Sequence, residues 1–502
     1  MLERYLRPFD ARRGLQEQLR ENLVDALLDG AVPPTDPLPS SRALAALLQV
    51  SRNTVVLVYE QLVQDGFLNP SSRRGYFVNQ TFVRQQLRMQ VRPPLRDALA
   101  PVAGTADSPD WSRRLRHHPS QLQAIVKPRN WREYAYPFVY GQVEMDALTS
   151  TRWRQCMRQA CAPAHMHSWV DDQVMHDDPL LVEQILNRVL PRRAIRARAD
   201  EVLVTIGTQN SLSLLASLLG QPGTVLGLED PGYVDARNIF GMAGCELLPL
   251  RVDSQGLVPG PALAPCDLVF CTPSHQAPTG VTMPVYRRLA LLECARQHDS
   301  VLIEDDYETE FNWLGGNHPA LKSFDHSGRV IYLGSLSKNL LPGLRLGFIV
   351  ADEELIQELR AMRRYAYRHP PLNNQRAMAL FLAMGYYDEH AGRLRERLAS
   401  KWKLITQAMH RHLPDFHVTG MPGGSSIWVR GPGGAQGLDA WALQRRAAQL
   451  GVLIEPGDVH FIGSQDRAGQ FRLGFGAIAE DRIEAGIRSL AQAWRQLQLA
   501  AA

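Results

Sequence analysis

Apolar positions in the first eighty residues recur at helical spacing in three places. A stripe of leucines and alanines predicts a first helix over 15–28, which Gly30 and the prolines after it end. Ser40 or Ser41 caps a second, short helix, and Ser51 caps a third. Two short apolar runs around a polar turn then predict a small hairpin. The later elements are predicted at 42–48, 52–64 and 67–78. Three helices followed by a hairpin indicate a winged helix-turn-helix.

Side chains at the start of the third predicted helix suit contacts with DNA. A recognition helix offers its first residues to base edges in the major groove, where Arg suits guanine and Asn suits adenine. The candidate DNA-binding residues are Ser41, Arg42, Ser51, Arg52, Asn53, Thr54 and, at the tip of the wing, Arg73 and Arg74. The segment 1–79 is neutral overall, so a small helical domain with ordinary surface arginines is the alternative. We favour double-stranded operator DNA as the partner, because the layout and the placement of the charges agree.

This segment resembles the winged-helix domain of the GntR-family bacterial transcription regulators over nearly all of residues 14–79. The most specific parts are the runs LPSSR at 38–42 and VSRNTV at 50–55. The resemblance implies a regulator that binds operator DNA.

From about residue 131 the pattern changes to apolar runs that alternate with amphipathic stretches. The runs have the length of buried strands, and helical stretches lie between some of them. Strands are predicted at 201–206, 224–228, 268–272, 301–304, 330–333 and 344–350, and helices at 212–219 and 286–298. This alternation predicts an α/β fold with a mostly parallel sheet flanked by helices.

The stretch between these two zones differs from both. Residues 80–130 contain scattered prolines, little apolar periodicity and an excess of basic side chains. We therefore predict three parts. A winged helix-turn-helix domain occupies 1–79, a basic Pro-containing linker occupies 80–130, and the α/β domain occupies 131–502.

Small and polar residues follow three of the predicted strands, where ligands gather in such sheets. After the first strand, small residues precede a helix whose N-terminal amides suit phosphate. After the fourth, an acid and a tyrosine two positions apart share a face. After the fifth, a lysine lies among small residues, and an arginine follows it. The residues gathered in this way are Gly207, Thr208, Gln209, Asp305, Tyr307, Ser335, Lys338 and Arg345.

Lysine is rare in this chain, with five lysines among 55 Lys and Arg residues. Lys338 alone of the five follows an apolar strand among small residues. A lysine, an acid, a tyrosine, a phosphate-binding helix end and an arginine together suit pyridoxal phosphate. The lysine forms the Schiff base, and the acid keeps the ring nitrogen protonated. Taken singly, Lys338 could be a surface charge and Asp305 a helix cap or an ion-pair partner. Their joint order favours the cofactor.

The region from about residue 140 to the C-terminus resembles the fold-type-I aminotransferases. The resemblance is carried by EDPGY (229–233), TPSHQAPTG (272–280), IEDDYETEF (303–311) and GSLSKNLLPGLRLG (334–347). It implies that Lys338 is the Schiff-base lysine, Asp305 the partner of the pyridinium nitrogen and Tyr307 the partner of the ring oxygen. It places Tyr233 against the ring and Arg472 on a substrate carboxylate. The phosphate contacts that it implies are Gly207, Thr208, Gln209, Ser335 and Arg345.

One position departs from the aminotransferase pattern. Many of these enzymes have Asn-Pro-Thr-Gly, whose Asn contacts the ring oxygen, and this chain has Ala277 before Pro-Thr-Gly. One ring contact is therefore lost, which argues against efficient turnover.

A GntR-like winged helix joined to an aminotransferase-like domain resembles the MocR/GabR type of regulator. The resemblance implies a sensor domain that holds pyridoxal phosphate in a head-to-tail, domain-swapped homodimer. A small amino-compound effector replaces Lys338 on the cofactor as an external aldimine, and its carboxylate pulls on Arg472. A working aminotransferase with a DNA-binding appendage is one alternative, which the winged helix and Ala277 disfavour. A cofactor-free dimerisation shell is another, and the intact Lys338, Asp305 and Arg345 argue against it.

A stretch near residue 180 carries two further hypotheses. DDPLLVE at 177–183, followed by LPRR at 190–193, resembles the ectoine-utilisation regulators or a broader subgroup. Just upstream, His165, His167 and His176 lie among acidic residues, but their spacing fits no tight ligand pattern. We therefore predict no metal site.

Composition excludes several other classes of protein. Of the 502 residues, 45% are apolar and 21% charged, which is the mix of a globular protein rather than a fibrous or disordered one. No run reaches the ~18 apolar residues of a membrane helix, and the start, MLERYLR, lacks the apolar part of a signal peptide. The six cysteines form no C-x-x-C pair. We expect a cytoplasmic protein with reduced thiols and no membrane partner.

Overall fold

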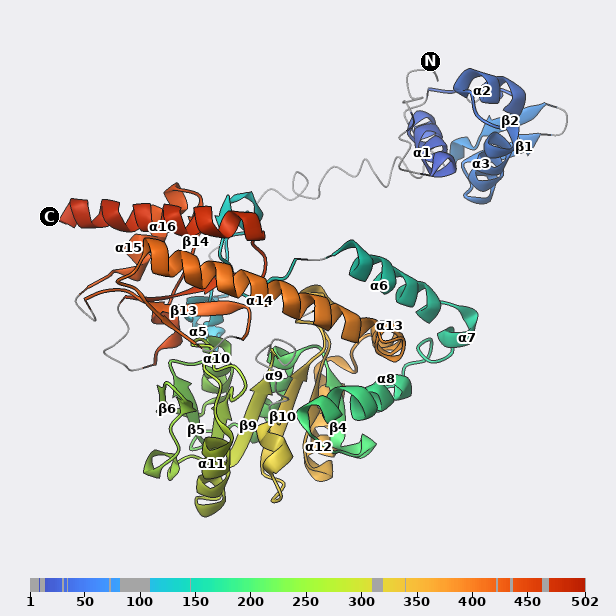
Figure 1. The fold of residues 1–502 in the computed structure, drawn as a ribbon. Helices are drawn as coiled ribbons and strands as arrows, with labels where there is room; N and C mark the ends of the chain where they lie inside the picture. Colours follow the sequence, from blue (N-terminus) through green and yellow to red (C-terminus); the bar gives the residue numbers. More distant parts are fainter. Residues whose placement is uncertain are drawn as a thin grey trace. The chain divides into compact units, whose positions relative to one another are not determined.

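The computed structural model describes residues 9, 14–28, 31–33, 35–71, 74–81, 109–144, 146–308, 319–338, 340–420, 423–433, 437–462 and 469–501. They form two compact units, Met1–Arg116 and His117–Ala502 (Figure 1). Arg73 of the predicted wing and most of the predicted linker lie outside the described residues. The linker boundaries at 79 and 130 stay predictions.

The first unit has the order of elements that the apolar spacing predicts. Its elements are α1 (Leu15–Leu28), α2 (Ser41–Leu48), α3 (Arg52–Gln64), β1 (Leu68–Ser71), β2 (Gly75–Val78) and α5 (Trp111–Arg114). Ser40 rather than Ser41 caps α2, because its side chain accepts the N–H of Ala43. The helices and the hairpin bury a common apolar core that includes Leu23 and Val58. The unit is a winged helix-turn-helix.

The second unit contains an eight-stranded mixed sheet in the order β4-β11-β10-β9-β8-β5-β6-β7. Its strands are β4 (Val202–Thr205), β5 (Val225–Asp230), β6 (Glu246–Asp253), β7 (Gly256–Leu257), β8 (Leu268–Cys271), β9 (Val301–Asp306), β10 (Val330–Ser335) and β11 (Gly347–Val350). The central strands β10, β9, β8, β5 and β6 pair in parallel, and β11 and β7 pair antiparallel with their neighbours. The parallel centre agrees with the predicted α/β class.

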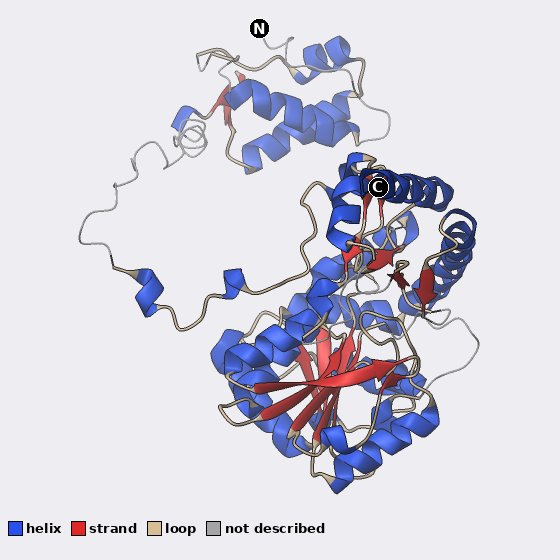
Figure 2. Ribbon diagram, turned by 90° about the vertical axis from the view of Figure 1, so that its left-hand side faces the viewer, coloured by secondary structure: helices blue, strands red, loops and turns tan. Residues whose placement is uncertain are grey.

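Helices cover both faces of this sheet (Figure 2). The helices of this part of the unit are α6 (Ala147–Ala160), α7 (Pro163–Met166), α8 (Pro179–Gln184), α9 (Thr208–Leu219), α10 (Val234–Ala243), α11 (Val285–Gln297), α12 (Glu353–Tyr367), α13 (Leu372–Ala383) and the long α14 (Tyr386–His412). The strands β4, β8 and β11 are buried at every position. Such continuous apolar strands are typical of a sheet that is covered on both sides.

A second, smaller sheet follows α14 in the same unit, in the order β12-β13-β16-β15. The remaining elements are β12 (His417–Thr419), β13 (Ser426–Arg430), α15 (Ala440–Gln449), β15 (Glu455–Pro456), β16 (Gln470–Gly474) and α16 (Glu480–Ala501), with β3 (Tyr136–Pro137) paired to β14 (Val452–Leu453). Across the described ranges, no helix is long and apolar enough to cross a membrane.

Candidate functional site

A cavity of about 500 Å³ in the second unit brings the predicted cofactor residues together. Ten predicted residues line it: Gly207, Thr208, Gln209, Tyr233, Asp305, Tyr307, Ser335, Lys338, Arg345 and Arg472. They come from loops and strand ends that are far apart in the sequence. Ala277, the departure from the aminotransferase pattern, lines the same cavity.

The register of the large sheet explains why these residues meet. Thr205 at the end of β4 and Ser335 at the end of β10 both pair with Gly347, the first residue of β11. Because β11 runs antiparallel to both neighbours, its start lies at the edge where they end. Asp305 on β9 pairs with Leu333 on β10, two residues before Ser335. One edge of the sheet therefore collects the ends of β4, β9 and β10 and the beginning of β11.

One end of the cavity has the features of a phosphate site. Gly207 precedes α9 with a φ of +95°, which glycine adopts without strain. A Cβ at Gly207 would lie 2.9 Å from Nη2 of Arg345, so the guanidinium lies directly against the start of the helix. The helix N-terminus and the guanidinium both attract anions. Ser335 lies beside them, and its Oγ accepts the N–H of Lys338 at 3.3 Å.

The other end of the cavity holds the side chain of Lys338 through two tyrosines. Lys338 Nζ donates to Oη of Tyr140 at 2.5 Å and lies 3.9 Å from the ring centroid of Tyr307. Tyr140 and Tyr307 hydrogen-bond through their side chains, and Tyr307 Oη donates to the carbonyl oxygen of His275 at 2.9 Å. Because each hydroxyl has one proton, this chain of bonds fixes the direction of both. The side chain of Lys338 is therefore held in place by hydrogen bonds of the protein itself.

Burial shifts the pKa values of the two central ionisable groups in opposite directions. It lowers the pKa of Lys338 to about 8, although the carboxylates of Glu308 and Asp305 oppose the shift. It raises the pKa of Asp305 to about 7, and the charge of Lys338 opposes that shift. Asp305 is 4% exposed, and its Oδ1 has no hydrogen-bond partner among the described residues. A buried carboxylate oxygen that lacks a partner inside a cavity points to a missing donor.

Two predicted contacts are engaged with a neighbouring carboxylate. Gln209 donates its side-chain amide to Oδ2 of Asp235, and Tyr233 donates its hydroxyl to the same oxygen at 3.1 Å. The ring of Tyr233 stacks on Phe270 at 6.4 Å between centroids. Tyr233 is thus held as a flat wall of the cavity, whereas the amide of Gln209 is not turned toward the phosphate end.

Several cavity residues were missed by sequence reasoning. Tyr140 lies in a loop outside the predicted strands and helices, so no pattern marks it. Glu455 is the single charged residue in the apolar run VLIEP at 452–456, and that isolation was a usable signal. It faces Arg472 across β15 and β16, and Nη2 of Arg472 donates to its Oε1 at 2.5 Å. Ile125, Val126, Lys127 and Pro128, from the end of the predicted linker, also line the cavity.

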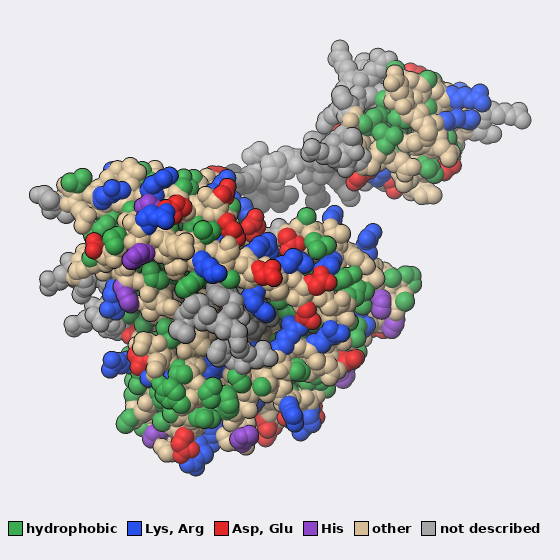
Figure 3. All heavy atoms as spheres, in the orientation of Figure 1, with side chains coloured by type: hydrophobic (Ala, Val, Ile, Leu, Met, Phe, Trp, Pro, Cys, Tyr) green, Lys and Arg blue, Asp and Glu red, His purple; other side chains and the backbone are tan. Residues whose placement is uncertain are grey.

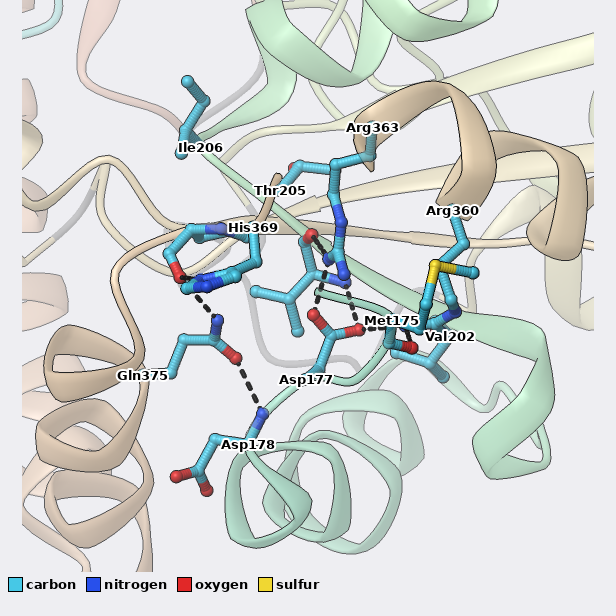
Figure 4. A network of polar contacts seen from close by, with 12 residues as sticks. Met175, Asp177, Asp178, Val202, Thr205, Ile206, Arg360, Arg363, His369 and Gln375 are labelled. Atoms are coloured by element: carbon cyan, nitrogen blue, oxygen red, sulfur yellow. Dashed lines mark hydrogen bonds and ion pairs between the residues drawn. The ribbon is translucent and has the colours of Figure 1, made fainter. Parts of the chain in front are cut away.

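The acidic stretch near residue 180 forms a buried polar network behind β4 (Figure 4). Asp177 accepts from Nη1 of Arg363 at 2.5 Å and from Nη1 of Arg360 at 2.8 Å. The same guanidiniums donate to backbone carbonyls of β4, at Val204 and Val202. The network therefore fixes the strand that leads to Gly207. No cluster of His, Cys, Asp and Glu that could hold a metal occurs in the described ranges.

The companion motif LPRR supports β9. Arg193 is buried, donating from Nε to Oδ2 of Asp306 at 2.7 Å and from Nη2 to Oγ of Ser274 at 2.6 Å. Asp306 follows Asp305 on β9, so this ion pair anchors the strand that carries the cavity carboxylate. Both halves of the motif thus have structural roles, and the ectoine subgroup stays a prediction.

The predicted DNA-binding residues that the structure describes lie at the starts of α2 and α3 and, for Arg74, in the β1–β2 turn. Ser51 caps α3, because its Oγ accepts the N–H of Thr54 at 3.1 Å. Arg52 donates from Nε to Oγ of Ser41 at 3.3 Å, which joins the starts of α2 and α3. The exposed members of the set are Arg42, Ser51, Arg52, Asn53 and Arg74. Figure 3 shows Lys and Arg side chains gathered at the end of this unit that carries the β1–β2 turn.

Comparison with known proteins identifies both units. Residues 15–78 match the bacterial regulatory proteins of the gntR family, and residues 148–490 match aminotransferase class I and II. HTH-type transcriptional regulator TauR of Rhodobacter capsulatus is 41% identical over 96% of each chain. The probable rhizopine catabolism regulatory protein MocR of Rhizobium meliloti is 30% identical over 97% of this chain and 95% of that protein. The chain belongs to the family of MocR-type transcriptional regulators.

Among solved structures, the second unit of this MocR-type chain is similar to an aminotransferase. LysN of Thermus thermophilus, an α-aminoadipate aminotransferase, aligns with a TM-score of 0.68 at 26% identity. The alignment covers 78% of this chain and all of LysN, which was solved in complex with N-(5'-phosphopyridoxyl)-L-leucine. The family and this neighbour together imply pyridoxal phosphate use in the MocR-type fold.

Proposed function

We propose that this chain is a transcription regulator that binds operator DNA with its first unit and senses an amino compound in the cavity of its second unit. The observation that carries the proposal is the convergence of Lys338, Asp305 and Arg345 on one cavity. A dimerisation shell without a cofactor has no use for a lysine and a carboxylate with these shifted pKa values.

The cavity residues fit pyridoxal phosphate. The volume of the cavity, about 500 Å³, lies within the range of small-molecule sites, ~300–1,000 Å³. Asp305 Oδ1, which is buried and has no hydrogen-bond partner among the described residues, would accept a hydrogen bond from the protonated ring nitrogen. The start of α9 at Gly207, with Thr208, Ser335 and Arg345, would hold the phosphate. When bound, the cofactor supplies an aldehyde that combines reversibly with amines and a ring that accepts electron density.

The protein's own residues prepare the exchange of one amine for another. A lowered pKa of about 8 leaves about a tenth of Lys338 uncharged at pH 7, and only the uncharged amine is a nucleophile. Tyr140 orients this amine through its 2.5 Å hydrogen bond. Arg472, 2% exposed, would take the acidic group of the effector. The effector class is therefore a small amine with an acidic group.

In the first unit, α3 would enter the major groove of operator DNA. Arg52 and Asn53 would read guanine and adenine edges, and Ser51 and Thr54 would lie near the phosphates. Arg42, Ser41, Arg74 and Arg73 would contact the backbone on either side. A protein that binds the chromosome works in the cytoplasm, and this location is part of the proposal.

The segment 125–128 offers a route from the cavity to the DNA-binding unit. It lines the cavity, and it lies a few residues after Arg116, the last residue of the first unit. An effector that contacts this wall would bias the conformation of the linker that precedes it. A ligand shifts such an equilibrium only by its differential affinity for the two states. We also propose the head-to-tail homodimer, which would place two winged helices on paired half-sites.

The test is an absorbance spectrum of the full chain with added pyridoxal phosphate, followed by borohydride reduction and a panel of amino compounds. We expect a visible band that reduction fixes onto Lys338, and a spectral change with one acidic amine that also alters retention of an operator fragment. Steady release of a keto acid would instead show the working aminotransferase. Absence of the band at saturating cofactor would overturn the sensing half of the proposal.

A further inference from the structure

The residue proposed to take the effector's acidic group already has a carboxylate partner. Glu455 and Arg472 are direct neighbours across β15 and β16, so the pairing is set by strand register. Both side chains line the cavity, with exposures of 15% for Glu455 and 2% for Arg472. The ion pair therefore stands on the small sheet and faces the ligand space.

A second contact reaches the same oxygen of Glu455. His460 lies 3.1 Å from Oε1 of Glu455 through Nε2, and 3.0 Å from the carbonyl oxygen of Gly232 through Nδ1. Burial acts to raise the pKa of Glu455, but Arg472 and His460 outweigh it and hold that pKa below its usual value. Glu455 is therefore an ionised carboxylate at neutral pH, with Arg472 as its charged partner.

The guanidinium of Arg472 is only half used by this pairing. Its Nη2 donates to Glu455, whereas its Nε has no hydrogen-bond partner in the part of the chain that the structure describes. Nε–H and Nη2–H form the fork that binds an anion with two parallel hydrogen bonds. An acidic group that took both donors would have to replace Glu455 on Nη2, since two carboxylates in a buried site repel each other.

We propose that Glu455 is a specificity-determining residue, an internal carboxylate that the acidic group of an effector must displace from Arg472. The inference rests on the proposed function, because it assumes that Arg472 receives the effector's acid. Amines without an acidic group would leave the pair intact. The ion pair thus excludes every ligand except an anion that can accept hydrogen bonds from both Nε and Nη2 of Arg472.

The experiment measures binding of propionate, a carboxylate without an amine, to the full chain loaded with pyridoxal phosphate by isothermal titration calorimetry. We expect Glu455→Gln to bind propionate about tenfold more tightly than the natural chain, because the competing charge is gone. Glu455→Ala should show the same gain, which covers a folding defect in either variant. Propionamide, which has no charge, should gain nothing.

Two variants separate this inference from the proposed function. Asp458→Asn removes a carboxylate from the same segment, where it accepts from the indole of Trp441 at 2.9 Å, and should leave propionate affinity unchanged. Arg472→Gln should abolish propionate binding both in the natural chain and in the chain with Glu455→Gln. Unchanged propionate affinity in both folded Glu455 variants would overturn the inference, while a loss in Arg472→Gln would still support the proposed acid site. A gain in the Glu455 variants without any response to amines would support the displacement and overturn the sensing function.

Discussion

The two units position their functional side chains in opposite ways. In the first unit, Ser51, Arg52 and Asn53 are neighbours in the sequence, exposed to solvent and placed by a helix cap. In the second unit, Asp305 and Lys338 come from different strand ends and meet only because a sheet register brings them to one edge. The first arrangement depends on local structure, and the second depends on the whole fold.

This difference has an energetic side. Exposed arginines at a helix start add charge to a surface and leave the core as it is. Burial shifts the pKa of Lys338 to about 8 and that of Asp305 to about 7, and the opposite charge of each group partly offsets the shift of the other. Variants in the first unit should therefore act singly on DNA, whereas variants in the cavity should act on several neighbours at once.

The largest effect should come from Lys338→Ala. Loss of the amine should abolish borohydride-stable attachment of the cofactor and the response of DNA binding to an amino compound. Operator affinity without effector should stay within about twofold, because the residues proposed to contact DNA belong to the other unit, which has its own core. Fragment retention with and without effector measures both. Lys403→Ala, at an exposed lysine on α14, is the matched control. A normal effector response in Lys338→Ala would break the comparison between the units.

Arg52→Ala should weaken operator binding by about 1–3 kcal/mol, as loss of a base contact does. The cofactor spectrum should be unchanged, because the cavity lies in the other unit. Binding titrations on operator variants provide the measurement. Arg20→Ala, which removes a surface ion pair with Asp65 on the same domain, should cost less than about 1 kcal/mol of stability and no specificity. Equal effects of the two variants on operator affinity would contradict the role of α3.

Gly207→Ala should reduce cofactor affinity about tenfold and the free energy of unfolding by about 1–3 kcal/mol. The new Cβ would lie 2.9 Å from the guanidinium of Arg345, in a backbone conformation that alanine disfavours. Cofactor titration and thermal unfolding give the two numbers. Gly343→Ala is the matched control, since a Cβ there meets nothing within 4 Å. Similar losses of cofactor affinity in both variants would contradict the proposal that the start of α9 holds the phosphate.

The last test changes the pH and leaves the chain as it is. Attachment of cofactor to Lys338 requires the uncharged amine, whose pKa burial lowers from 10.5 to about 8. Its rate should rise about tenfold per pH unit below that value and level off above it. Stopped-flow absorbance between pH 6 and pH 10 records the midpoint of this profile. The control is lysine in solution that is acetylated on its α-amine, so that its side-chain amine is free. A rate that keeps rising to pH 10 would show that the cavity does not tune Lys338.

Local patterns were sufficient to predict the first unit. The helix over 15–28 and the cap at Ser51 are confirmed, because caps and apolar spacing act within a few residues. The strands that carry the cavity residues were also predictable, since they are continuously apolar. The antiparallel direction of β11 and the second sheet depend on long-range pairing, which no short pattern records. Glu455 reaches the cavity through that pairing and Tyr140 through a loop, and so both were missed.

The connection between β10 and β11 supplies two of the charged residues that line the cavity. It carries Lys338 near its beginning and Arg345 near its end, so one short hairpin supplies both the proposed attachment point and a proposed phosphate contact. Deletion or exchange of this single hairpin would remove both holds on the cofactor in one step. A descendant that lost this hairpin would still bind DNA but would no longer bind the proposed cofactor. A gene exchange that kept the hairpin would transfer the attachment point and the phosphate contact together.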